Sequence, residues 1–126
     1  MQDSPSAPEL LDAVAAYLFG ELRESVPREE RFRVLVAANL CTVVARELRA
    51  GVEPSIEDLR LFRHLSGAEE PGSSPERAPA EARRAAAELA GLIREGALDS
   101  RLEETIAALA GHVRRKLEIA RPGYAE

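Results

Sequence analysis

The sequence predicts an all-α protein, a five-helix bundle built from helical hairpins around a central apolar second helix. Apolar residues recur at spacings of three and four along five segments, which is the pattern of amphipathic helices. Glycine and proline separate these segments, and no alternating run of β-branched residues predicts a strand. The chain has 126 residues, close to the commonest domain size, so we expect one domain over 1–126.

The first helix is expected to begin after Ser6 and to reach about Ser25. Ser6 and Glu9 have the spacing of a capping box, in which each side chain bonds the other residue's backbone N–H. Pro8 lies in the first turn, where a missing N–H costs nothing. The apolar stripe of this helix consists of Leu10, Leu11, Val14, Leu18 and Leu22.

The second helix follows Pro27 and contains residues 34–45, where only Asn39 and Thr42 are polar. This run is shorter than the roughly 20 residues of a membrane span. A helix that is apolar on nearly every side must be wrapped by other elements, so we expect it at the centre of the bundle. Gly51 is expected to end it in the left-handed conformation. The predicted buried stripe is Phe32, Leu35, Val36, Leu40 and Val43.

The third helix is expected to begin with Ser55 as its cap and to end at Gly67. Residues 67–79 contain three prolines, two glycines and two serines, a composition that disrupts regular structure. We therefore predict a flexible loop there, between helices 1–3 and helices 4–5. The predicted buried side of the third helix is Leu59, Phe62 and Leu65.

The fourth helix is expected from about Pro79 to Glu95, with Gly96 ending it. The fifth is expected to begin at the capping box of Ser100 and Glu103 and to end before Pro122. Gly96 precedes Ser100 by four residues, as Gly51 precedes Ser55, so two helical hairpins are predicted. The fourth helix should bury Ala82, Ala85, Ala86, Leu89, Leu92 and Ile93, and the fifth Leu102, Ile106, Leu109, Val113, Leu117 and Ala120.

Composition limits the function classes. The formal net charge of −5 argues against binding of a phosphate backbone, which requires a basic face. The single cysteine, Cys41, suits a reducing compartment, and no signal peptide opens the chain, so a cytoplasmic protein without membrane association is expected. Scarce amide side chains and abundant arginine are typical either of a thermophile or of a G+C-rich genome.

No catalytic or metal-binding constellation is recognisable. His64, His112 and Cys41 have no partner at a metal-ligand spacing, and no Glu-x-x-His occurs. There is no Gly-x-Ser-x-Gly and no glycine-rich phosphate loop. His64 and the basic cluster around Arg115 are interpreted as partners of the negative helix ends. We therefore expect no catalytic residue, no metal, no cofactor and no enzyme activity.

Asn39 is the strongest single candidate for a functional side chain, because it is the only asparagine and lies within the apolar run. A buried amide needs hydrogen-bond partners, and leaving it unpaired costs about 1–3 kcal/mol. One interpretation is a polar pin that fixes helix register. The other is a hydrogen-bonding group in a pocket between helices.

Several short segments together form a recognisable set. They are Glu9-Leu-Leu, Arg31-Phe, Val36-Ala-Ala-Asn39, Val44-Ala-Arg-Glu-Leu48, Arg94-Glu-Gly-Ala-Leu-Asp99 and Lys116-Leu-Glu-Ile-Ala120, with Pro122 and Tyr124. The set resembles a bacterial family of small helical domains of unknown function, found beside or fused to aminoglycoside-phosphotransferase-like kinases. The resemblance covers most of the chain and implies such a kinase as a partner. Asn39, Arg46 and Glu47 match the recurring polar positions of that family.

The leading hypothesis is a non-catalytic accessory or interaction domain. Its partner would be a kinase-like phosphotransferase or a second copy of the chain, which makes a homodimer one alternative. A second hypothesis is a helical protein that binds a small molecule, an acyl chain or a nucleotide, beside Asn39. Under either hypothesis the candidate binding residues are Asn39, Arg46 and Glu47.

Overall fold

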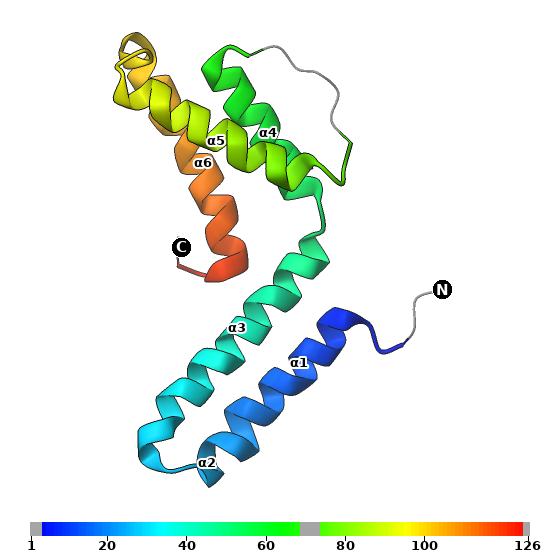
Figure 1. Cartoon of the computed structure of the whole chain (residues 1–126). Coiled ribbons are helices and arrows are strands. Elements are labelled where there is room, and N and C mark those ends of the chain that lie inside the picture. Colours follow the sequence, from blue (N-terminus) through cyan, green and yellow to red (C-terminus); the bar gives the residue numbers. More distant parts are fainter. Residues whose placement is uncertain (1–3, 69–73, 125–126) are drawn as a thin grey trace. The chain divides into compact units, whose positions relative to one another are not determined.

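The computed structural model describes residues 4–68 and 74–124, and it confirms the all-α class (Figure 1). Over these residues there are five long helices and no strand. None of the helices described is long and apolar enough to span a bilayer. The long helices are α1 (Ala7–Tyr17), α3 (Arg31–Ala50), α4 (Glu53–Ser66), α5 (Ala78–Arg94) and α6 (Leu102–Ala120). Short elements are the π-helical η1 (Leu18–Leu22), α2 (Arg23–Ser25) and the 3₁₀ turns η2 (Arg28–Glu30) and η3 (Asp99–Arg101).

The described residues divide into two compact units, and the helices pack in pairs within them. Unit 1 consists of residues 4–50 and 119–124, and unit 2 of residues 51–68 and 74–118. In unit 1, α1 packs against α3; in unit 2, α4 packs against α5. The organisation as a single domain stays a prediction.

The start and the length of the first helix follow the prediction. The Ser6 backbone N–H donates to Glu9 Oε2 at 2.6 Å, and the Glu9 N–H donates to Ser6 Oγ at 3.4 Å. This is the predicted capping box. Helical backbone then continues through η1 and α2 to Ser25, where the helix was expected to end.

The contact between α1 and α3 is made by small residues. The buried residues of these two helices are Ala15, Ala38 and Ala45. Alanine lets helix axes approach closely, so α1 covers one side of α3. The prediction that Phe32, Val36 and Leu40 are buried is wrong, because all three are exposed. Periodicity could not separate the two sides, since α3 has apolar residues on both of them.

The core of unit 2 is larger and follows the prediction more closely. Ala86, Ile93, Ala108 and Leu109 pack against this core as partly buried side chains. The predicted buried side of the third helix is therefore confirmed, as are the buried positions at Ala82, Ala85 and Leu89. The core consists of Leu59, Phe62, Leu65, Ala82, Ala85, Leu89 and Leu98.

Two predicted helix starts in unit 2 are wrong. α4 begins at Glu53 rather than after Ser55, because Pro54 fits the first turn, where its missing N–H is not needed. Ser100 lies inside η3, and α6 begins after this turn at Leu102. The stripe predicted for this last helix is also partly wrong, since Leu102, Ile106 and Val113 are exposed.

The helix ends agree with the prediction, and Gly51, Gly67 and Gly96 all have positive φ. At Gly67 the φ of 75° is combined with bonds from the Gly67 N–H to the His64 carbonyl and from the Ala68 N–H to the Arg63 carbonyl. This arrangement satisfies carbonyls that the helix leaves without partners. The predicted flexible loop at 67–79 lies partly outside the described residues, and α5 begins at Ala78.

Candidate functional site

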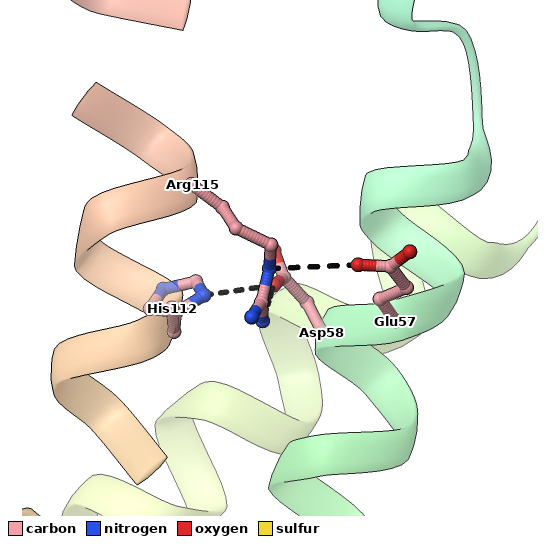
Figure 2. A network of polar contacts seen from close by, with 4 residues as sticks. All are labelled: Glu57, Asp58, His112 and Arg115. Atoms are coloured by element: carbon pink, nitrogen blue, oxygen red, sulfur yellow. Dashed lines mark hydrogen bonds and ion pairs between the residues drawn. The ribbon is translucent and has the colours of Figure 1, made fainter. Parts of the chain in front are cut away.

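A polar network in unit 2 joins α4 to α6 (Figure 2). His112 Nδ1 lies 2.8 Å from Asp58 Oδ1, and Arg115 Nη2 lies 3.4 Å from the same oxygen. Arg115 Nε is 3.5 Å from Glu57 Oε2. His112 and Arg115 are three residues apart on α6, so both project toward α4.

The central pair of this network is largely withdrawn from solvent. The side chains of His112 and Asp58 are only 12% and 15% exposed. The Phe62 ring packs edge-to-face on the His112 ring, with centroids 4.9 Å apart and an interplanar angle of 71°. A polar group at this depth is costly without a partner, so the network satisfies these groups and holds α6 against the core.

A histidine hydrogen-bonded to a carboxylate also occurs in catalytic triads, where it activates a nucleophile. Here the groups seen around the pair are a cation, a second carboxylate and an aromatic ring. Residues 4–68 and 74–124 contain no group of three or more His, Cys, Asp or Glu side chains that could hold a metal ion. The arrangement is that of a tertiary contact between helices.

Sequence reasoning missed this network. In the sequence, His112 has no partner at a metal-ligand spacing, and Arg115 is interpreted as a partner of the negative helix end. The available signal was Asp58, a carboxylate next to the buried Leu59. A charged group at such a position needs a partner of opposite charge, and the basic residues of α6 could supply one.

Unit 1 presents an exposed apolar face along α3, and we call its five large residues the α3 stripe. The stripe repeats every four residues, so its members form one continuous ridge that turns by about 40° at each step. At about 100° per residue, its centre at Leu40 lies about 150° around the helix from Ala38 and Ala45. The side opposite α1 is therefore apolar and exposed. The α3 stripe consists of Phe32 (73% exposed), Val36 (42%), Leu40 (58%), Val44 (42%) and Leu48 (50%).

Single exposed leucines are ordinary on protein surfaces, but a contiguous ridge of large apolar side chains is not. Such surfaces mark interaction sites in folded proteins. Two other helices also expose large apolar residues, namely Leu10, Val14 and Tyr17 on α1 and Leu102, Ile106 and Val113 on α6. The α3 stripe, with five large residues, is the longest of these surfaces.

The predicted site residues do not converge. Asn39 is exposed, so its predicted burial is wrong. It lies beside the α3 stripe, two turns before Arg46. Arg46 is partly buried and donates from Nη1 to the Ile119 carbonyl at 3.0 Å, a bond between residues of unit 1. Glu47 is exposed and lies within the surface of the stripe. Their role in binding stays a prediction.

A hollow of about 330 Å³ lies where the first hairpin turns. Its walls come from Arg23 and Glu24 on one side of the turn and from Arg31 and Leu35 on the other. Ligand pockets are usually enclosed, whereas this hollow is open to solvent and three of its four residues carry a charge. The lining does not include Asn39.

Comparison with known proteins identifies the family. DUF6285, described as a domain of unknown function, matches residues 24–124. The chain belongs to this family. The matched region of the DUF6285 domain contains α3 to α6, so it includes both the α3 stripe and the polar network. The resemblance to a helical domain of unknown function is thus confirmed, but the match shows no association with kinases. No curated protein and no solved structure matches the chain.

Proposed function

We propose that this DUF6285 domain is a non-catalytic interaction domain whose contact surface is the α3 stripe. The exposure of five large apolar side chains outside the α1 contact carries the proposal. Burial of apolar surface is the dominant favourable term in protein association. A partner helix or sheet face that covers this ridge would remove it from water.

The polar network supports the non-catalytic assignment. Its histidine and aspartate are held by Arg115 and by Phe62, and they connect α4 to α6. A general base must be within hydrogen-bond reach of a substrate proton. The His112 ring bonds Asp58 through Nδ1 at 2.8 Å and packs against Phe62, and only 12% of its side chain is exposed to a substrate.

Two partners follow from this proposal. The resemblance to domains found beside kinase-like phosphotransferases favours such an enzyme, and the geometry of the stripe favours a second copy of the chain.

The experiment is a binding measurement between the purified chain and a purified phosphotransferase-like kinase, by biolayer interferometry. Leu40→Glu places a charge at the centre of the stripe and is expected to weaken binding at least tenfold. The matched control is Ile106→Glu, because Ile106 and Leu40 are both 58% exposed. Binding that is lost in the control and kept in Leu40→Glu would overturn the assignment to α3. Circular dichroism establishes that both variants are folded.

A further inference from the structure

We infer that the α3 stripe pairs with the α3 stripe of a second copy, with the two helices antiparallel and related by a two-fold axis at Leu40. This inference rests on the proposed function, because it names the partner of the same surface. Symmetric dimers are the commonest oligomers, and their interfaces must be self-complementary. The α3 stripe meets that requirement in both shape and charge.

The apolar residues are arranged symmetrically about Leu40. Val36 and Val44 lie four residues before and after it, and Phe32 and Leu48 lie eight residues before and after it. In an antiparallel pair centred on Leu40, each valine meets the valine of the other copy. Phe32 and Leu48 lie about 80° to either side of Leu40, so they flank this contact. The central residues of the stripe therefore have apolar partners, and Leu40 meets its own copy.

The charges on this face are also symmetric and opposite in sign. Arg33 lies seven residues before Leu40, and Glu47 lies seven residues after it. Seven residues are about two helical turns, so both side chains lie on the same side of α3 as Leu40. The antiparallel pair brings each Arg33 opposite Glu47 of the other copy, which makes two ion pairs.

Arg33 is able to make this contact. Its side chain is 80% exposed, and its only ion pair among the described residues is with Glu30 at 3.6 Å. An exposed pair of this kind contributes little free energy, so it can rearrange when a better partner arrives. A parallel arrangement would instead place Arg33 opposite Arg33, and like charges would disfavour it.

The size of the surface predicts a weak dimer. Exposed portions of five large side chains carry on the order of 500 Å² per copy, since a large aromatic side chain buries about 150–250 Å² when fully covered. Two copies would bury about 1,000 Å², which is the lower limit for a specific interface. We therefore expect a dimer Kd between about 1 µM and about 1 mM.

The first experiment is sedimentation velocity of the full chain over this concentration range. The wild type is expected to shift from monomer to dimer as the concentration rises. Leu40→Glu should raise the dimer Kd at least tenfold, whereas the equally exposed control Ile106→Glu should change it less than threefold. A wild type that stays monomeric throughout, or a dimer indifferent to Leu40→Glu, would overturn the inference.

The second experiment tests the antiparallel register by charge exchange. Arg33→Glu creates two pairs of like charges and should raise the Kd about tenfold, and Glu47→Arg should do the same. The double variant Arg33→Glu/Glu47→Arg restores opposite charges at both contacts, so its Kd should return to within about threefold of the wild type. Failure of the double variant to recover would rule out this register.

The two levels of the proposal can fail separately. A monomeric wild type that binds the kinase through Leu40 would refute the second copy as partner and would keep the α3 stripe as the interaction surface. A dimer and a kinase complex that both ignore Leu40→Glu would refute the surface itself.

Discussion

Replacement of Leu89 by alanine tests where the core of this protein lies. Leu89 is 2% exposed and belongs to the cluster formed by α4 and α5. Alanine lacks three of its carbon atoms, which is about 2.4 kcal/mol at ~0.8 kcal/mol per buried methylene. The cavity left behind adds to this loss, so a free-energy change of about 3 kcal/mol is expected. The same substitution at Leu102, which is 46% exposed, should cost about 1 kcal/mol because only part of its surface is buried.

The assay is urea denaturation followed by circular dichroism, with the wild type and both variants at one protein concentration. The two variants should differ by about 2 kcal/mol, which is about 1 M in the urea midpoint at typical slopes for small proteins. Equal losses for Leu89→Ala and Leu102→Ala would refute the placement of the core. A larger loss at Leu102 would show that another contact buries this side of α6.

Three further predictions concern the turn after α5, the polar network and the first helix. Gly96→Ala should destabilise the protein by about 1–2 kcal/mol, because Gly96 has a φ of 81°. Gly91→Ala, in the interior of α5, should instead stabilise it by about 0.5–1 kcal/mol. Equal effects of the two substitutions in thermal denaturation would contradict this prediction. Asp58→Ala should lower the free energy of unfolding by about 1–3 kcal/mol, because it leaves a buried histidine unpaired. Glu57→Ala, at a more exposed position, should lower it by less than ~1 kcal/mol in the same assay. A larger loss for Glu57→Ala than for Asp58→Ala would refute the role of the network. The pKa of Glu9 is lowered from its ordinary value of 4.5, chiefly by the hydrogen bond from the Ser6 backbone N–H. The stability that this cap contributes is therefore present above pH 4.5 and is lost as the pH falls through the lowered pKa. An NMR titration in which the Glu9 midpoint is at or above those of the other glutamates would be the contrary result.

Much of the fold could be predicted from sequence because local signals specify helices strongly. The capping box at Ser6, the left-handed glycines at Gly51 and Gly96, and the buried spacing of Leu59 and Phe62 all depend on residues within a few positions of one another. Periodicity at three and four residues then assigns one apolar side to each helix. In unit 2 the buried sides of α4 and α5 follow these rules, whereas half of the stripe predicted for α6 is exposed.

The environment of α3 could not be predicted in the same way. This helix has small apolar residues on one side, including Ala38 and Ala45, and large ones on the other. Hydrophobicity favoured burial of the large side, but α1 packs on the small side, where close approach is available. Asn39 was therefore placed in a core although it is exposed.

The polar network escaped prediction for a different reason. Asp58 and His112 are separated by 54 residues, and their contact depends on how α4 and α6 pack. No local pattern encodes such a pairing. A charged residue beside a buried leucine signals that a partner exists, without naming it.

Hydroxyl-radical footprinting of the full chain at low and at high concentration tests the central claim most directly. We expect oxidation of Phe32 and Leu40 in the dilute protein and their protection in the concentrated protein, while Phe62 and Leu89 are protected in both. Protection of Phe32 and Leu40 even in the dilute protein would contradict this expectation, because another part of the same chain would then cover the α3 stripe.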